Sequence, residues 1–427
     1  MQDTLNIIKK FIPKKIFTFF QPAYHYLIIL IGTIIYRFPS KKIHIIGITG
    51  TKGKSTTTEI MNSILEAAGY KTALSNTIRF KIGDESKANK YKMSMPGRFF
   101  MQKFLYQAVK EGCSHAVIEI TSEGSKQFRH KFIDLDAFIF TNLSPEHIES
   151  HGSYEKYRQA KLNIADNLDN KSKKNTILVA NKDDIESELF LEKKADKKIT
   201  YSLSDVKPFN IDDDGIEMRF NKTTFYSKLN GEFNIYNILA AATLANELGI
   251  PHETIKKGVE NLDVVKGRVQ KVDAGQEFDV IVDYAHTADS LEKLYKAFPN
   301  KKKVCVLGNT GGGRDKWKRP EMAKIAEKYC EEIILTNEDP YDEDPKKIIK
   351  EMSSAISDSK KPIHEILDRR IAINTAIEKA KKIGKNSVVL ISGKGTDPYI
   401  MEANNKKTPW SDFEVAKEEI KKVTKTN

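Results

Sequence analysis

The feature of this chain that most constrains its fold is a glycine-rich loop within residues 47–58, which read Gly-Ile-Thr-Gly-Thr-Lys-Gly-Lys-Ser-Thr-Thr-Thr. Residues 42–46 before it form a β-branched run typical of a buried strand, and residues 59–68 after it carry apolar side chains at helical spacing. A strand, a tight turn and a helix in this order direct backbone N–H groups and the positive end of a helix dipole at one point, where a phosphate can bind. The pattern therefore predicts a nucleoside triphosphate site, in which Lys54 reaches the terminal phosphates and the Ser55 hydroxyl ligates Mg²⁺.

The loop is a shorter variant of the common phosphate-binding pattern, since the position where that pattern has its first glycine is Ile48. A glycine turn that merely joins a strand to a helix is the alternative. The adjacent Lys54 and Ser55 argue against that alternative, because a simple connection needs neither side chain.

Alternating strand and helix patterns predict an α/β fold over the rest of the chain. Strands are expected at residues 116–120, 137–142 and 176–180, and in a second unit at 279–283, 303–307, 332–336 and 387–392. We predict a P-loop mononucleotide-binding central domain with a mostly parallel sheet, followed by a Rossmann-like C-terminal α/β domain. The expected boundaries are 1–40 for an apolar helical segment, 41–266 for the central domain and 267–427 for the C-terminal domain.

Composition limits the kind of protein and its partners. The chain of 427 residues is 40% hydrophobic and 30% charged, which is typical of a globular protein. Its formal charge of +12 comes from scattered lysines without interleaved aromatic residues, so an acidic small substrate is favoured over nucleic acid. Cys113, Cys305 and Cys330 lie far apart and are odd in number, which indicates reduced core residues in a cytoplasmic protein.

An apolar run at residues 24–36 lies between Pro22 and Pro39. It is shorter than the roughly 20 residues that span a bilayer, and no small-residue cleavage site follows it. We favour a helix packed on the body of the protein. The alternative is an interfacial helix in contact with a membrane surface, assisted by Lys9, Lys10, Lys14 and Lys15.

Glu119 is an acid within an otherwise apolar strand, where burial without a partner is costly. A metal ion would supply that partner, and His147 follows the end of the next expected strand. One carboxylate, one imidazole and a phosphate-bound cation suit Mg²⁺ or Mn²⁺. An edge glutamate and a surface histidine are the alternative. Lys161, taken alone, is expected to be a solvated lysine.

Several blocks of this sequence together resemble the Mur ligase family. They lie at residues 50–55, 141–152 with Tyr157 and Lys161, 233–237, 267–268, 282–287, 311–315, 318–320 and 393–395. The resemblance covers roughly residues 41–420 in the family's order. Within the family, residues 283–290 are most similar to the ligase that adds the third peptide residue to UDP-N-acetylmuramoyl-L-alanyl-D-glutamate, although the usual proline is Ala288.

The resemblance implies an ATP-dependent enzyme that forms an amide bond through an acyl phosphate in peptidoglycan biosynthesis. A muramoyl-peptide precursor and a free amino acid would be the substrates, with two Mg²⁺ ions. By family position, Glu119 and His147 serve the second ion and Lys161 is the lysine that the family carbamylates. The nucleotide would contact Gly50, Thr51, Lys52, Gly53, Lys54, Ser55, Thr56, Asn237, Arg268 and Asp283. Because Arg268 and Asp283 belong to the C-terminal domain, the resemblance implies that domain closure completes the active site.

Substrate positions follow from the same resemblance. Ser94, Thr121, Gln127 and Arg129 match positions that hold the muramoyl peptide, although Ser94-Met95-Pro96 replaces the usual two threonines and proline, and Glu123 replaces a histidine. The amino acid would contact Arg314, Asp339, Pro340, Tyr341, Gly393 and Asp397. Tyr341 stands where an arginine would recognise the distal carboxylate of diaminopimelate, and tyrosine cannot form that ion pair. Lysine, ornithine and another amine remain open.

The resemblance also predicts what lies before the loop. Mur relatives carry a small domain there for the UDP moiety, whereas 46 residues precede Gly47 here, fewer than a separate core usually needs. We therefore expect the usual UDP-binding domain to be lacking, and leave a UDP-linked or a lipid-linked carrier open. A monomer is expected.

Two other functions were weighed. A folylpolyglutamate-synthase-like glutamate ligase shares the core and also lacks the UDP domain, but residues 54–57 and 283–290 favour the Mur form. A non-catalytic nucleotide-binding partner would need the loop alone. The joint presence of Glu119, His147 and Lys161 argues against it.

Overall fold

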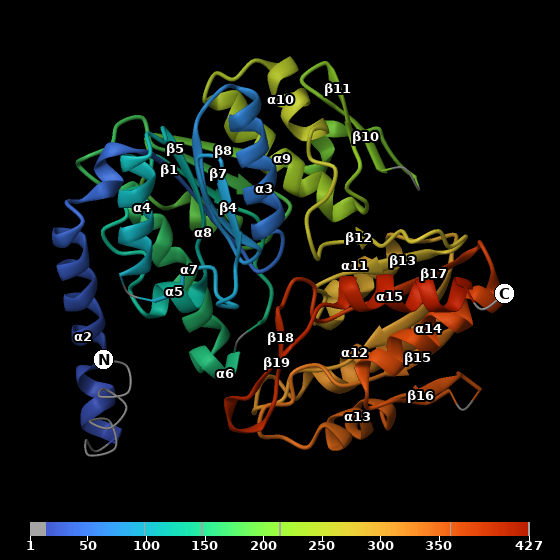
Figure 1. The fold of residues 1–427 in the computed structure, drawn as a ribbon. Helices are drawn as coiled ribbons and strands as arrows, with labels where there is room; N and C mark the ends of the chain where they lie inside the picture. Colours follow the sequence, from blue (N-terminus) through green and yellow to red (C-terminus); the bar gives the residue numbers. More distant parts are fainter. Residues whose placement is uncertain (1–13, 98, 147, 213–214, 359, 426–427) are drawn as a thin grey trace. The chain divides into compact units, whose positions relative to one another are not determined.

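The structure is a computed structural model, which describes residues 14–97, 99–146, 148–212, 215–358 and 360–425 (Figure 1). The chain divides into two compact units. Unit 1 comprises Met1–Ser144, Ser153–Asp205 and Tyr236–Gly258, and unit 2 comprises Pro145–Gly152, Val206–Ile235 and Val259–Asn427. The domain boundaries at residues 40 and 266 stay a prediction.

Unit 1 is built on an eight-stranded sheet of order β4-β3-β2-β5-β1-β6-β7-β8. Six of these strands run parallel, namely β2, β5, β1, β6, β7 and β8. The other two, β3 and β4, form an antiparallel edge. The strands are β1 His44–Thr49, β2 Thr72–Ser75, β3 Arg79–Ile82, β4 Glu85–Ala88, β5 His115–Glu119, β6 Ala137–Phe140, β7 Ile177–Asn181 and β8 Lys197–Tyr201. The central strands are buried along almost their whole length, as a parallel sheet covered on both faces requires.

The helices of unit 1 connect these strands and cover the sheet. They are α2 Lys14–Ile35, α3 Lys54–Ala67, α4 Phe100–Lys110, α5 Ser122–Lys126, α7 Tyr154–Ala165 and α8 Ser187–Leu191, while α9 Glu232–Glu247 and α10 His252–Glu260 each cross the division between units. One core joins Phe104 of α4 and Leu162 of α7 to Ile118 of β5 and Phe138 of β6.

Unit 2 contains a six-stranded sheet of order β12-β13-β17-β14-β15-β16, parallel except for β12, and a separate three-stranded antiparallel sheet, β11-β10-β9. The strands are β9 Phe209–Asp212, β10 Gly215–Phe220, β11 Thr223–Ser227, β12 Gln270–Lys271, β13 Asp279–Val282, β14 Lys302–Leu307, β15 Glu332–Leu335, β16 Ile363–Glu365, β17 Ser387–Ile391, β18 Tyr399–Met401 and β19 Lys407–Pro409. The helices are α6 Ile148–His151, α11 Ala288–Lys296, α12 Lys318–Tyr329, α13 Pro345–Ser353, α14 Arg369–Ile383 and α15 Asp412–Lys425.

Alternation along β13 explains why the larger sheet of unit 2 carries helices on both faces. Val280 and Val282 pack in one core with residues of α14 and α15, whereas Ile281 packs in another with residues of α11, α12 and α13. Successive strand side chains point to opposite faces, so an all-apolar strand builds two cores. The predicted α/β fold class, with a P-loop sheet and a second Rossmann-like unit, is confirmed.

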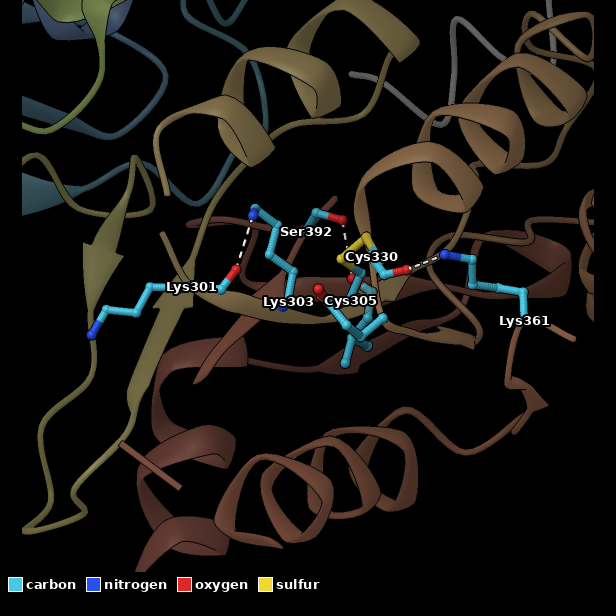
Figure 2. The surroundings of a disulfide bond; sticks show 8 residues. Lys301, Lys303, Cys305, Cys330, Lys361 and Ser392 are labelled. Carbon is cyan, nitrogen blue, oxygen red and sulfur yellow. Dashed lines mark hydrogen bonds between the residues drawn. A yellow bond between two sulfur atoms is a disulfide. The ribbon is translucent and has the colours of Figure 1, made fainter. Parts of the chain in front are cut away.

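The prediction of three reduced cysteines is wrong for two of them. Cys305 of β14 and Cys330, which follows α12, form a disulfide with their Cα atoms 6.1 Å apart (Figure 2). The pairing of β14 with β15 brings these residues together, because the α12 crossover returns the chain to the neighbouring strand. Cys113 is free and buried, as expected.

Helix α2 packs along α4, which confirms the packed N-terminal helix (Figure 1). Gly32 permits the close approach, since a Cβ atom there would lie 2.7 Å from Phe99 Cδ1. Among the helices that the structure describes, none is long and apolar enough to cross a membrane.

Candidate active site

The phosphate-binding loop lies between β1 and α3, as predicted. Gly50 and Gly53 both have positive φ, at 153° and 83°. A Cβ at Gly50 would lie 1.9 Å from Thr141 Oγ1, and one at Gly53 would lie 2.2 Å from Asn237 Oδ1. Only glycine fits at either position, because a side chain there would collide with Thr141 or Asn237.

Lys54 begins α3 and its ammonium group lies on the loop. Lys54 Nζ donates to the carbonyl oxygens of Gly50 at 3.0 Å and Thr51 at 2.9 Å. The cation is therefore held beside the first turn of α3, where the helix dipole also favours an anion.

Glu119 closes β5 next to the loop and accepts three hydrogen bonds. Oε2 accepts from Ser55 Oγ at 2.7 Å and from the Thr77 amide at 3.0 Å, and Oε1 accepts from Thr77 Oγ1 at 3.0 Å. Burial, at 2% exposed, opposes ionisation, but the Lys54 charge and these hydrogen bonds outweigh it and lower the pKa of Glu119. The carboxylate is thus an anion in contact with the Ser55 hydroxyl.

Thr77 was missed by the sequence interpretation, although it joins two predicted residues. Its hydroxyl lies 2.7 Å from Ser94 Oγ, and it donates to Glu119. Thr77 follows the carboxyl end of β2, and the carboxyl ends of parallel strands are where open α/β sheets bind ligands, which is the signal that would have found it.

Lys161 is buried, which corrects the expectation of a solvated lysine. It lies on α7 at 2% exposed, its Nζ donates to the Gly50 carbonyl at 2.6 Å, and it lies 5.1 Å from the centroid of the Tyr157 ring. The Gly50 carbonyl therefore accepts from two lysine ammonium groups, those of Lys54 and Lys161. Lys161 is buried and Lys54 is half-buried, and two like charges on one carbonyl oxygen repel, which is a reason for one of them to be modified or neutralised.

The remaining loop residues are braced by neighbouring segments. Lys52 exchanges two hydrogen bonds with the Asn142 side chain, at 2.9 and 3.0 Å, and Thr51 Oγ1 lies 2.9 Å from the Tyr157 hydroxyl. Thr56 is buried in the first turn of α3, and Asn237 of α9 accepts from Thr57 Oγ1 at 3.3 Å.

The predicted muramoyl-peptide residues form a second group around α5. Thr121 caps this helix by accepting from the Gly124 amide at 3.1 Å. Arg129 donates to Gln127 Oε1 at 2.6 Å and to the carbonyl of Met95, the residue after Ser94. The structure therefore brings Gln127 and Arg129 to the segment that carries Ser94, and their substrate role stays a prediction.

The residues around the loop fit Mg²⁺ and a phosphate ester. Ser55 and Glu119 offer oxygen ligands, Lys54 offers a cation, and the glycine loop leads into the amino end of α3. His147 lies outside the described residues. Within the ranges that the structure covers, no group of three or more His, Cys, Asp or Glu side chains gathers as a metal site.

In unit 2, Arg268 and Asp283 lie on adjoining segments. Asp283 accepts from the amides of Val269 and Ala285, each at 2.7 Å, and the Arg268 guanidinium lies 4.4 Å from the centroid of the Tyr284 ring. Burial raises the pKa of Asp283, and the Arg268 charge opposes that rise only in part.

The predicted amino-acid residues in unit 2 gather around Lys394, which was not predicted as a site residue. Lys394 Nζ is 1% exposed and lies 2.7 Å from Asp339 Oδ1 and 3.6 Å from Asp397 Oδ2. Pro340 follows Asp339, and Tyr341 then has a positive φ of 52° and donates its amide to the Met401 carbonyl at 3.0 Å. The Arg314 guanidinium lies 5.1 Å from the centroid of the Tyr341 ring.

Glu338 is a further acid in this group. Its Oε1 accepts from Thr310 Oγ1 at 2.9 Å, whereas its Oε2 has no hydrogen-bond partner within the described part of the chain. Burial and the adjacent Asp339 charge raise the pKa of Glu338. Gly393 lies against this oxygen, since a Cβ there would be 2.4 Å from Oε2.

The buried Arg369 holds the backbone next to this group of residues in place. It forms an ion pair with Asp412 at 2.7 Å and donates to the carbonyls of Asn337 at 3.1 Å and Ser392 at 2.8 Å. These two carbonyls belong to the segments that lead into Glu338 and Gly393.

Comparisons with known proteins agree with these features. Two family models match the chain, the Mur ligase middle domain over residues 48–245 and the Mur ligase, glutamate ligase domain over residues 267–395. The chain is 37% identical over 405 residues to the UDP-N-acetylmuramoyl-L-alanyl-D-glutamate--2,6-diaminopimelate ligase of Bacillus cereus, covering 92% of this chain and 81% of that protein.

Solved structures give the same fold. A structure of a UDP-N-acetylmuramoyl-L-alanyl-D-glutamate--2,6-diaminopimelate ligase has a TM-score of 0.61 at 29% identity, covering 89% of this chain and 78% of that one. A folylpolyglutamate synthase of Mycobacterium tuberculosis has a TM-score of 0.73 at 15% identity, covering 87% and 93%. At that identity the second likeness concerns the fold alone.

Proposed function

Because the chain belongs to the Mur ligase family, whose members are ATP-dependent ligases that form amide bonds, we propose that it adds an amino acid to a UDP-N-acetylmuramoyl-dipeptide-like precursor in peptidoglycan biosynthesis. The observation that carries the proposal is the contact of ionised Glu119 with Ser55 beside Lys54 on the loop. A simple nucleotide-binding module has no need of a buried carboxylate there. We further propose that the enzyme works as a cytoplasmic monomer.

The residues of unit 1 suit activation of a carboxylate. Bound ATP would supply the phosphoryl group that converts the substrate carboxylate into an acyl phosphate, which the incoming amine attacks with loss of phosphate. Lys54 would offset charge on the terminal phosphates, and Ser55 and Glu119 would hold Mg²⁺. Their fixed positions bring negative oxygens together without reorganisation, which is most of what phosphoryl transfer requires.

Carbamylation of Lys161 is part of the proposal. Its ammonium group shares the Gly50 carbonyl with that of Lys54, so a carbamate there would replace two like charges with an attractive pair. The resulting anion could hold a second Mg²⁺, together with His147. Isotope-labelled bicarbonate should give a carbamate signal in the unmodified protein and none in Lys161→Arg.

For the amino acid, we propose a diamino acid with a single carboxylate, such as lysine or ornithine. Arg314 would bind the α-carboxylate, held by its stacking on Tyr341, and Asp397 would bind the α-amine. The surrounding acids Glu338 and Asp339 share this region with two buried cations, Lys394, which pairs with Asp339, and Arg369, which pairs with Asp412. A second substrate carboxylate would add negative charge where Tyr341 cannot offset it.

Phosphate release from ATP tests the reaction. UDP-muramoyl peptides, lipid-linked muramoyl peptides and folates would each be combined with lysine, ornithine, diaminopimelate and glutamate. We expect release to depend on a muramoyl peptide and a diamino acid together. Release that requires a folate and glutamate would instead establish the folylpolyglutamate-type reaction, and release with neither would contradict the proposal.

A further inference from the structure

Helix α2 has one face that the protein covers and an apolar face that it leaves exposed. The inner face consists of His25, Ile29, Gly32 and Thr33, which are buried. The outer face, which we define as Leu27, Ile31, Ile34 and Ile35, is 41% to 60% exposed. These two sets recur at helical spacing on opposite sides of one helix.

The distribution of polarity on α2 is the reverse of that on an ordinary surface helix. On α13, Ile348, Ile349 and Met352 are buried, and the exposed positions include Lys346 and Lys350. On α2 the polar His25 and Thr33 face inward. The Thr33 hydroxyl donates a hydrogen bond to the Ile29 carbonyl oxygen at 2.8 Å. Because apolar side chains line the exposed face of α2, this outer face calls for an apolar partner.

The outer face is held in a fixed orientation. The Tyr26 ring lies 5.2 Å from that of Phe132, and the Tyr36 ring lies 5.7 Å from that of Tyr106. Gly32 lies directly on Phe99. These contacts extend from Tyr26 to Tyr36, so this part of the chain presents Leu27 to Ile35 as a ridge fixed on unit 1.

Basic residues follow this ridge and also begin the helix. Arg37, Lys41 and Lys42 follow the helix and are exposed. Lys14 and Lys15 are the first two residues of α2, and Asp3 is the single acid in the sequence before residue 43. Pairing of two copies along this helix, in either direction, would bring these cations together, whereas an anionic surface with an apolar interior complements them.

We propose that the outer face of α2 binds an anionic lipid bilayer. The helix lies parallel to the surface, with Leu27, Ile31, Ile34 and Ile35 among the upper acyl chains and the flanking lysines and arginine at the headgroups. It does not cross the bilayer. The binding is separate from the proposed ligase reaction, because none of these residues belongs to either group of site residues.

Flotation of the full-length protein with vesicles tests the proposal. We expect binding to vesicles of phosphatidylglycerol and phosphatidylethanolamine, weaker binding to phosphatidylcholine alone, and loss of the difference at high salt. Leu27→Gln/Ile31→Gln/Ile34→Gln should reduce the partition coefficient on the order of 100-fold, because three half-exposed apolar side chains lose their burial. The matched control is Ile185→Gln/Ile371→Gln, which removes exposed isoleucines from elsewhere and should leave binding unchanged.

A second variant covers the case in which the triple substitution disturbs folding. Lys41→Gln/Lys42→Gln should reduce binding to the anionic vesicles alone. ATP-dependent phosphate release is measured on every variant and should be unaffected, so failure of vesicle binding and failure of the ligase reaction are seen separately. Equal affinity for anionic and neutral vesicles, no binding to either, or a dimer that the triple variant dissociates would overturn the proposal.

Discussion

We expect Glu119→Gln to reduce ATP-dependent phosphate release about a thousandfold while the fold of unit 1 is retained. Glutamine has nearly the same shape, and its amide oxygen can accept from Ser55 and Thr77 in place of Oε2. What is lost is the negative charge that Lys54 and Mg²⁺ face. Two unit charges about 4 Å apart near a protein surface interact by about 4 kcal/mol, which corresponds to roughly a thousandfold in rate.

The same variant makes a prediction about pH. Because folding lowers the pKa of Glu119 below its ordinary value of 4.5, the ionised carboxylate stabilises the folded state above pH 4.5. This stabilisation is lost as the pH falls through the lower pKa of the folded protein. The unfolding free energy of Glu119→Gln should therefore fall less steeply below pH 4.5 than that of the unmodified protein.

The assay is steady-state phosphate release at several Mg²⁺ concentrations, with urea unfolding as the measure of stability. The matched control is Glu419→Gln in α15, since Glu419 is 3% exposed, accepts hydrogen bonds from Arg370, Asn374 and Lys422, and also has a lowered pKa. The control should lose stability and keep its activity within about twofold. A Glu119→Gln variant within tenfold of full activity would refute the role given to the charge.

Three further variants follow from the same geometry. Lys54→Ala should abolish ATP turnover and leave the fold intact, and turnover by a folded variant would contradict the assignment of the loop. Lys161→Ala should be nearly inactive and be partly rescued by a short added carboxylate in the phosphate-release assay; full activity without the carboxylate would defeat the carbamylation proposal. The unmodified protein is expected to prefer lysine over diaminopimelate on the order of a thousandfold, and Tyr341→Arg should reduce that preference. Competition kinetics in which the unmodified protein favours diaminopimelate would refute the reasoning from Tyr341.

The sequence was sufficient for features that depend on local pattern. The loop around Gly53, the strand that ends at Glu119 and the alternating elements of both units all lie where their spacing predicted. Ser55 and Glu119 were both predicted to bind Mg²⁺, on the first and the second ion respectively, although their direct hydrogen bond was not predicted. Local pattern was enough here because parallel strands place their carboxyl ends at one edge.

Features that depend on long-range packing were not predictable in this way. Lys161 has the sequence surroundings of a solvated residue and becomes buried because α7 passes behind Gly50. Cys305 and Cys330 are 25 residues apart and meet only because β14 and β15 are neighbours. The apolar run at 24–36 indicated a helix but could not show which of its faces the protein would leave uncovered.

The register of β5 against β1 places a strict limit on how unit 1 can evolve. Glu119 stands opposite Ile48, one strand position before the turn into the loop. Because side chains alternate across a sheet, deleting one residue from β5 would bring Ile118 or Ile120 to that position and turn the carboxylate toward the apolar core. The strand would remain hydrophobic and the domain would still fold, yet the protein would have lost the anion that we propose to hold Mg²⁺. Insertions and deletions in this family should therefore collect in the helical crossovers, where length does not alter strand phase.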